Sequence, residues 1–319
     1  MVEAYKRSRD YFWFVVAGFV VAGPVFAAWA NMDLSKDSAH WIFERFFLLP
    51  HVVAAPLTGL GVVLVSRMAL ATGGPLRRRL INGAFLLSVT IALAGPAAAA
   101  HGRIDESTNR IGGQYAHDVL DSVEPETLIL ASGDEHTLPL AYALAVERRR
   151  PDVILVMAPL LKAAWYVRHL RMLYPALGVP DRTVASTINL KLLVDANRSR
   201  PVVMVGPETD SSLWESYGVV RHGLVLRVEP REQSFDFTQL AQENDALLRK
   251  YRPPRSDTIR RETFEPNLLR SYAAPAEWIA SQYSQFGLRA EAAAWHQRAL
   301  EIDPFYSEAR QGLAQSGGK

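Results

Sequence analysis

Long apolar runs dominate the first hundred positions of this 319-residue chain, and shorter ones recur further along it. Three of the early runs, residues 11–30, 51–70 and 80–100, are predominantly apolar over about 20 positions, the length that an α-helix needs to cross a bilayer. The first run could be the core of a signal peptide, but it is long and two further runs follow it. The pattern predicts a membrane domain with three transmembrane helices over residues 1–100.

The basic residues around these runs predict an orientation. Lys6, Arg7 and Arg9 precede the first run. Arg67 lies at the end of the second run, and residues 77–79, all arginine, lie between the second and third. In the loop between the first two runs, acidic residues balance the basic ones. Because basic loops stay on the cytoplasmic side, we expect a multi-pass protein with a cytoplasmic N-terminus. Three crossings then place the C-terminal domains on the extracytoplasmic side.

After a polar connector at residues 101–112, the pattern changes to short apolar runs that alternate with amphipathic stretches. Near-continuous apolar runs at 127–131, 153–157 and 202–205 are typical of strands covered on both faces. Residues 219–228 read as an edge strand with a bend at Gly223. Helices are expected between these runs, near residues 114–122, 137–147, 160–173 and 186–196. Residues 113–230 are therefore predicted to form a three-layer α/β domain around a parallel sheet, with right-handed crossovers.

The remaining chain is predicted to be helical. Residues 231–272 read as a charged, proline-containing linker with one helix at 237–251. Residues 273–319 fit one tetratricopeptide-like repeat and a further short helix. The positions that fit the repeat are Tyr283, Gly287, Ala292, Ala299 and Pro304, whereas Ala276 and His296 stand where larger aromatic residues are usual. Since one repeat cannot bury its own apolar face, we expect it to pack on the α/β domain or to dock a protein partner.

Three polar residues follow the first predicted strand. Asp134, Glu135 and His136 come directly after it, and open α/β sheets bind ligands at the carboxyl edge of their strands. They are candidates for a binding site. The alternative is that Asp134 caps the next helix, because Asp is a favoured cap and Pro139 suits a first turn.

A second candidate lies in the loop between the first two apolar runs. Glu44 and Arg45 stand among aromatic residues, which an interfacial aromatic belt would explain without any further function. Alternatively, the arginine grips the phosphate of a lipid-linked sugar, since its guanidinium suits bidentate phosphate binding.

Other chemistry is not indicated. The chain has no cysteine and a net charge of +2, and its histidines show no metal-ligand spacing, so we predict no metal, no cofactor and no nucleic-acid partner. It contains no phosphate-binding glycine motif and no nucleophile elbow. Residues 148–150, all arginine, are expected to form a solvated face at a helix end. Trp165 and Tyr166 are expected to be core or interface aromatics.

Several motifs together resemble a known family. They are G-D-x-x-T-x-P-L from Gly133 to Leu140, R-x-D-V from Arg150 to Val153, L-L-x-x-x-W-Y from Leu160 to Tyr166, and E-R-F-F from Glu44 to Phe47 with Pro50. As a set they resemble the protein O-mannosyltransferase-like membrane family. The resemblance continues to Arg200, Pro201 and Gly223, and so covers most of the chain.

The resemblance implies a polytopic glycosyltransferase of the GT-C class that uses a polyprenyl-phosphate sugar as donor and a polypeptide as acceptor. In such enzymes an acidic residue of the first outward loop serves catalysis, and no residue here matches that loop, so no catalytic residue is assigned. We therefore expect the C-terminal portion of a larger transferase, contributing acceptor or partner binding outside the membrane. A non-enzymatic, membrane-anchored scaffold with a docking repeat is the alternative.

Overall fold

The computed structural model describes residues 6, 8–30, 44, 46–70, 74–180, 189–207 and 211–317. The chain divides into two compact units. Residues 1–109 with 261–263 form the first, here called the helical unit, and residues 110–260 with 264–319 form the second, the α/β unit.

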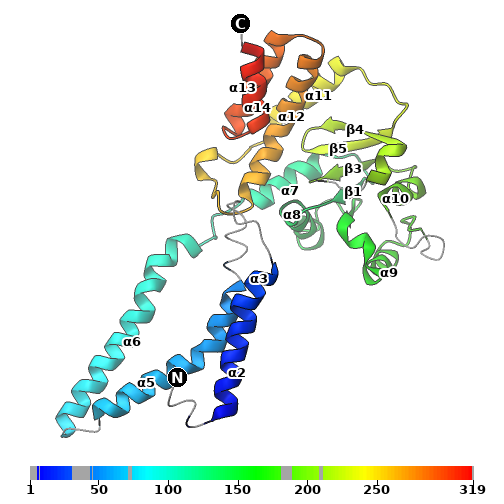
Figure 1. The fold of residues 1–319 in the computed structure, drawn as a ribbon. Helices are drawn as coiled ribbons and strands as arrows, with labels where there is room; N and C mark the ends of the chain where they lie inside the picture. The colour runs from blue at the N-terminus through cyan, green and yellow to red at the C-terminus, as the bar shows by residue number, and fades with distance from the viewer. Residues whose placement is uncertain are drawn as a thin grey trace. The chain divides into compact units, whose positions relative to one another are not determined.

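Apolar helices make up the described part of the helical unit (Figure 1). Helix α2 (Arg9–Val20) continues through a π-helical turn, η1 (Val21–Val25), into α3 (Phe26–Ala30), and α5 (Leu48–Leu70) and α6 (Pro75–Ile104) follow. Ser8 caps α2, because its side chain accepts a hydrogen bond from the amide of Tyr11. Pro24 lies inside the π-helical turn. A widened turn of this kind accommodates a residue that cannot donate a hydrogen bond.

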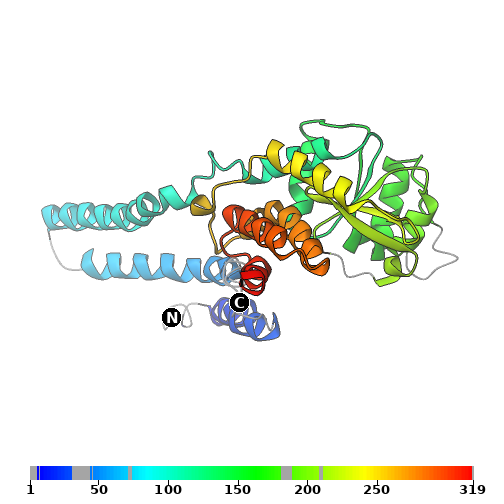
Figure 2. The same ribbon diagram turned by 90° about the horizontal axis from the view of Figure 1, so that it is seen from above.

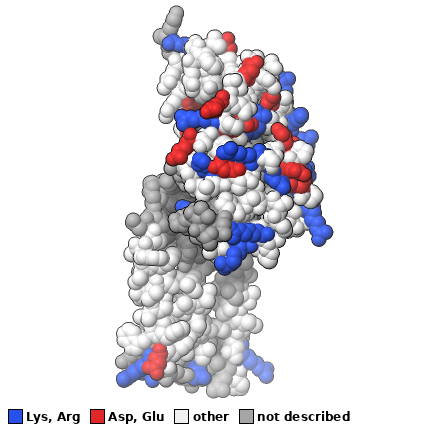
Figure 3. Space-filling model, turned by 90° about the vertical axis from the view of Figure 1, so that its right-hand side faces the viewer, with Lys and Arg blue, Asp and Glu red and all other residues white. Residues whose placement is uncertain are grey.

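Two helical stretches among the described residues, rather than the three predicted, are long and apolar enough to cross a membrane. They are Arg9–Ala30 and Asn82–His101, while Leu48–Leu64 is apolar but shorter. Little of the two candidate spans is buried within the protein: Trp29 and Phe14 are 81% and 70% exposed. On the face seen in Figure 3, the described part of the helical unit shows charged side chains at its lower end and few along the rest of its length. Helices of this kind need an apolar surrounding to cover them.

A five-stranded sheet forms the centre of the α/β unit. Its strands are β1 (Leu128–Ala131), β2 (Ile154–Met157), β3 (Val202–Val205), β4 (Tyr217–His222) and β5 (Val225–Pro230). The spatial order is β2-β1-β3-β5-β4. Strands β1, β2 and β3 are parallel, whereas β5 is antiparallel to both β3 and β4. The sheet is therefore mixed: the three strands that the sequence predicted from its buried apolar runs are parallel, and β5 is antiparallel to its neighbours.

The predicted bent strand at 219–228 is in fact a hairpin. Gly223 lies in its turn with φ of +57°, a left-handed conformation that glycine adopts without steric cost. The turn reverses the chain, and β5 then pairs between β3 and the edge strand β4. A single bend at Gly223 would have left the chain running on as one edge strand.

Helices cover both faces of the sheet (Figure 1). Helices α7 (Ile111–Ser122) and α8 (Asp134–Ala145) pack on one face through residues such as Tyr115 and Leu140. Helices α9 (Ala164–Leu173) and α10 (Leu190–Ala196) pack on the other through residues such as Leu170 and Leu193. Successive residues of β1 point alternately into the two cores. This is the expected three-layer arrangement. Short 3₁₀ turns η2 (Ala158–Lys162), η3 (Ser211–Glu215) and η4 (Ser256–Thr258) complete the connections.

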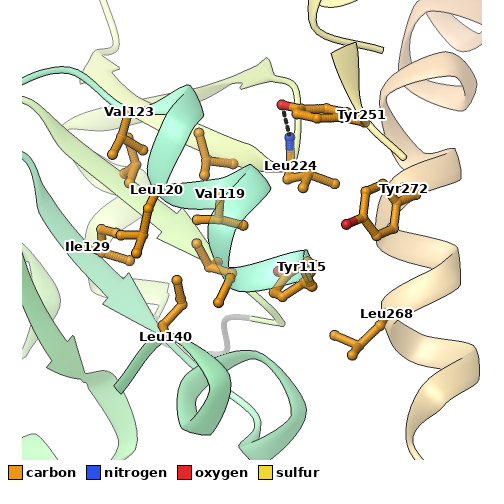
Figure 4. Close-up of a cluster of buried hydrophobic side chains, with 14 of the residues drawn as sticks. Tyr115, Val119, Leu120, Val123, Ile129, Leu140, Leu224, Tyr251, Leu268 and Tyr272 are labelled. Carbon is orange, nitrogen blue, oxygen red and sulfur yellow. Dashed lines mark hydrogen bonds between the residues drawn. The ribbon is translucent and has the colours of Figure 1, made fainter. Parts of the chain in front are cut away.

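The C-terminal helices form a layer of their own, well separated from α9 and α10 (Figure 2). Helix α11 (Phe237–Lys250) precedes α12 (Glu265–Gln285), α13 (Arg289–Ile302) and α14 (Ser307–Gly317). Helix α12 starts eight residues before the expected start of the repeat, at residue 273. Its buried side chains Leu268 and Tyr272 face Tyr115 of α7 (Figure 4). The layer therefore packs on the α/β fold.

The sequence predicted that Arg150 belongs to a solvated face, but the structure gives it specific partners. Its guanidinium donates to the carbonyls of Leu120, Val123 and Glu124 and to the carboxylate of Asp152. These bonds tie the end of α7 to the start of β2. Hydrogen bonding to Arg150 also lowers the pKa of Asp152. The R-x-D-V motif thus has a structural role. Similarly, Tyr166 is buried as predicted, but its neighbour Trp165 is exposed.

Candidate functional site

The strand order creates a switch point between β1 and β3. The chain leaves β1 for β2 on one side and returns to β3 on the other, with connecting helices on opposite faces of the sheet. In open α/β sheets, ligands bind where such connections diverge, at the carboxyl ends of the strands. The segments that follow Ala131 and Val205 meet at this edge.

Two glycines shape this edge. Gly133 follows β1 with φ of +83°, and Gly206 follows β3 with φ of +84°. A Cβ atom at Gly206 would collide with the carbonyl oxygen of Ser132 and come within 2.8 Å of the ring of His136. Glycine at position 206 therefore allows the two turns to approach closely, and it sets His136 directly beside the end of β3.

A pocket of about 350 Å³ opens at this switch point. Its walls come from α7, the start of α8, the end of β3, the β4–β5 hairpin, α12 and the residue before α14. Most polar groups in its lining belong to Tyr115, Glu135, His136, Arg221, Asn267, Arg270, Ser271 and Tyr306. The volume lies near the lower end of the range for small-molecule sites.

The structure brings together two of the three residues predicted here. Glu135 and His136 line the pocket, whereas Asp134 is exposed and does not line it. Nor does Asp134 cap α8: Gly133 is the N-cap, and Asp134 is the first helical residue. A carboxylate in the first turn still complements the helix dipole.

His136 is held by a buried hydrogen bond. Its Nδ1 lies 2.9 Å from the hydroxyl of Tyr115, and the two rings are in contact. Burial lowers the pKa of His136 and raises that of Tyr115. Both groups are therefore neutral near neutral pH, so they offer hydrogen bonds and no charge to the pocket.

The sequence reasoning missed the residues that come from beyond β3. Arg221 lies in β4, Asn267 and Arg270 in α12, and Tyr306 just before α14. Only Arg221 carried a local signal, as a charged residue within an apolar strand pattern. The others lie on helices expected to form a linker and a repeat.

These distant residues are ordered by contacts among themselves. Asn267 donates to Glu135 across 2.8 Å, which fixes that carboxylate against α12. The guanidinium of Arg270 pairs with Glu308 and lies 4.4 Å from the centre of the Tyr306 ring. Helix α12 and the segment leading into α14 thus complete the wall of the pocket.

A larger pocket, of about 690 Å³, lies at the opposite edge of the sheet, near the starts of β1 and β3. Two of its lining residues, His222 and Arg227, have a carboxylate partner beside the pocket: they lie 3.6 and 3.8 Å from Glu243. Burial lowers the pKa of His222. Its position at the amino ends of the strands and its internally balanced charges make it the weaker candidate.

The candidates in the helical unit are only partly described. Arg45 lies outside the described residues, and Glu44 is an exposed helical residue whose carbonyl accepts from the amide of Phe47. An apolar pocket of about 390 Å³ lies nearby, lined by Ala22, Phe26, Phe46, Leu48, Leu49 and Val52. The rings of Phe26 and Phe46 are 4.8 Å apart. A pocket of this composition suits an acyl or prenyl chain.

Comparison with known proteins agrees with the motifs. Residues 113–185, from α7 through β1, α8 and β2 to beyond α9, match the family described as TMEM260-associated domain 2. Over 300 residues the chain is 28% identical to the protein O-mannosyl-transferase TMEM260 of Mus musculus. The matched residues make up 88% of this chain and 40% of the mouse protein. This chain is similar to a protein O-mannosyl-transferase.

A second relative extends this result. The protein O-mannosyl-transferase tmem260 of Dictyostelium discoideum is 25% identical over 225 residues, which are 65% of this chain and 27% of that protein. These matches support an O-mannosyltransferase-like family. The chain spans less than half the length of either relative. No solved structure matches it.

Proposed function

We propose that this chain is the portion of a membrane glycosyltransferase that binds the acceptor polypeptide or a partner outside the membrane. The donor is a sugar carried on a lipid phosphate, as in the GT-C class. The observation that carries the proposal is the 28% identity to a protein O-mannosyl-transferase over 88% of this chain.

The helical unit supports the membrane part of this proposal. Its candidate spans expose apolar side chains along their length, as lipid-facing helices do. We propose three crossings, with a cytoplasmic N-terminus and the α/β unit on the extracytoplasmic side. We further propose that the apolar pocket beside Phe46 takes part of the donor's lipid chain and that Arg45 binds its phosphate, with Glu44 as a second binding candidate.

The α/β unit supports the binding part. Its switch-point pocket lies at the edge where folds of this type hold ligands. We also propose that α12 and α13 form the tetratricopeptide-like repeat. In support, the small residues Ala276, Ala292 and Ala299 are fully buried, and Gly287 takes φ of +76° in the turn between these helices.

Disrupting the gene and comparing the glycopeptides of the cell envelope by mass spectrometry tests the proposal. We expect hexose-modified serine or threonine peptides to disappear and to return when the intact gene is restored. An unchanged set of glycopeptides would overturn the transferase proposal. Unchanged glycopeptides together with the loss of membrane proteins that otherwise co-purify with this chain would favour the scaffold alternative.

A complementation arm relates the effect to the α/β unit. Glu135→Gln and Asn267→Ala alter the pocket wall, whereas Gln239→Ala removes an exposed amide on α11, outside the pocket. The first two variants should restore glycosylation less well than the third at equal protein levels.

A further inference from the structure

We propose that the switch-point pocket binds a small hydroxylated molecule that carries a phosphate or a carboxylate, and that the guanidinium of Arg221 is the partner of that anion. The inference rests on the proposal that this pocket is a binding site. It does not depend on glycosyl transfer or on membrane orientation.

Arg221 is the central observation. It projects from β4 into the pocket lining, and its Nε is inaccessible to solvent without a hydrogen-bond partner in the described chain. No ion pair or side-chain hydrogen bond of this guanidinium occurs among the described residues; the side chain of Asn244 donates to the backbone carbonyl of Arg221 and not to its side chain. Arg221 is half-buried, and a guanidinium nitrogen that is removed from water without an acceptor is costly unless something else supplies one.

The groups around Arg221 do not neutralise it. The ionisable side chains that act on it most are the phenols of Tyr306, Tyr115 and Tyr251. Burial raises the pKa of all three, so they remain uncharged near neutral pH. Burial also lowers the pKa of Arg221, but a guanidinium stays protonated in proteins. Glu135 is the carboxylate in the described lining, and it is bonded to Asn267. Within the described part of the chain, the guanidinium of Arg221 therefore has no ion-pair partner.

The rest of the lining fits an anion attached to a polar body. Arg270, although paired with Glu308, adds guanidinium donors to the lining, and the first turn of α8 places the positive end of a helix dipole at the same edge. Glu135, in that same first turn, and Asn267 form a hydrogen-bonded pair that can accept from and donate to hydroxyl groups. About 350 Å³ accommodates a molecule of monosaccharide size with one anionic group.

The pocket at the other edge of the sheet provides a contrast. There Arg227 also has an unpartnered Nε, but the carboxylates of Glu229 and Glu243 lie within 4.0 Å of its guanidinium. Its charge is balanced by the protein. Of these two arginines, Arg221 is therefore the one that we expect to bind an anion from outside the protein.

Isothermal titration calorimetry on the full chain in detergent, in phosphate-free buffer, tests the inference. Glucose 1-phosphate, glucuronate, inorganic phosphate and uncharged glucose are the probes. We expect the two sugar anions to bind more tightly than glucose, with inorganic phosphate in between. Tighter binding of glucose 1-phosphate than glucuronate would identify a phosphate site, and the reverse a carboxylate site. If no anion binds more tightly than glucose, the inference is wrong.

Arg221→Gln is the decisive variant, with Arg168→Gln, an exposed arginine of α9, as the matched control. We expect the first to weaken anion binding about 10- to 100-fold, the usual effect of losing a charge-assisted hydrogen bond, and the second to leave it unchanged. Thermal unfolding without ligand separates binding from folding. Removing an unpartnered buried charge should keep or raise the Tm, whereas a clear fall in Tm would show that Arg221 has a structural role and overturn the inference.

These measurements stand apart from the glycopeptide comparison. Anion binding with unchanged glycopeptides would refute the transferase proposal and keep this site. Lost glycopeptides without anion binding would support the transferase proposal and refute the anion site.

Discussion

The hydroxyl of Tyr272 donates to Oδ2 of Asp118 across 2.6 Å, although 154 positions separate the two residues. The bond is buried and joins α12 to α7. Asp118 accepts a second bond from Gln114, and the Tyr272 ring packs edge-on against Tyr115 and Tyr251 (Figure 4). This contact holds the C-terminal helices against the α/β fold, and so holds Asn267 and Arg270 at the pocket.

Tyr272→Phe should therefore destabilise the α/β unit. The substitution keeps the ring and removes one of the hydrogen bonds of a buried carboxylate, a loss of about 1.5–3 kcal/mol. Chemical denaturation of the full chain, followed by near-ultraviolet circular dichroism, measures it. Tyr283→Phe, on the same helix, is the control, because no hydrogen bond of its hydroxyl is present among the described residues. Equal stability of the two variants would contradict this role of Asp118.

Gly206→Ala should disturb the switch point. The residue has φ of +84°, and an added Cβ would strike the Ser132 carbonyl. Strain of this kind costs about 1–3 kcal/mol, and we expect weaker ligand binding as well, since His136 would shift. Gly218→Ala is the control, because nothing lies within 4 Å of its added Cβ. Unfolding curves that coincide for the two variants would show that the turns can separate freely.

Asp195 should contribute to stability in an acid-sensitive way. Hydrogen bonds from Lys191, Arg198 and Tyr217 lower its pKa to about 2, against about 3.9 in an unfolded chain. Because the folded pKa is the lower one, this stabilisation is fully present above about pH 4 and is lost as the pH falls towards 2.

Asp195→Asn should therefore lower the Tm at pH 6 and flatten the fall in Tm between pH 4 and pH 2. Asp257→Asn, which removes an exposed carboxylate, should leave that slope as in the parent protein. If Tm falls as steeply between pH 4 and pH 2 in Asp195→Asn as in the parent protein, Asp195 does not have this role. Scanning fluorimetry over this pH range provides the comparison.

The absence of cysteine makes the proposed topology directly measurable. Lys6→Cys and Gln315→Cys place single thiols at exposed positions of the two units. With intact cells, a membrane-impermeant maleimide should label position 315, and position 6 only after permeabilisation. The opposite pattern would reverse the orientation, and labelling of both in intact cells would rule out three crossings.

Local sequence patterns predicted much of the α/β unit correctly. The runs at 127–131, 153–157 and 202–205 became β1, β2 and β3 within one residue, because a strand covered on both faces must be apolar at nearly every position. Gly133 and the polar residues after β1 likewise indicated the carboxyl edge, where Glu135 and His136 now line a pocket.

The pairing of those strands with one another could not be predicted from local sequence patterns. Residues 219–228 have the composition of one strand, and only long-range pairing makes β5 antiparallel to β3. Strand identity depends on local hydrophobicity, whereas sheet order depends on hydrogen bonds between segments far apart in the chain.

The sequence by itself determined the apolar helices, the three parallel strands and the position of the first polar turn, since each follows from residues within one short segment. Only the tertiary structure decided that Arg221, Asn267 and Tyr306 would meet His136 at one pocket. These residues come from four segments spread over 170 positions, and their meeting depends on how the hairpin and α12 pack on α7. That packing arises from contacts such as Tyr272 with Asp118, which have no counterpart in local periodicity.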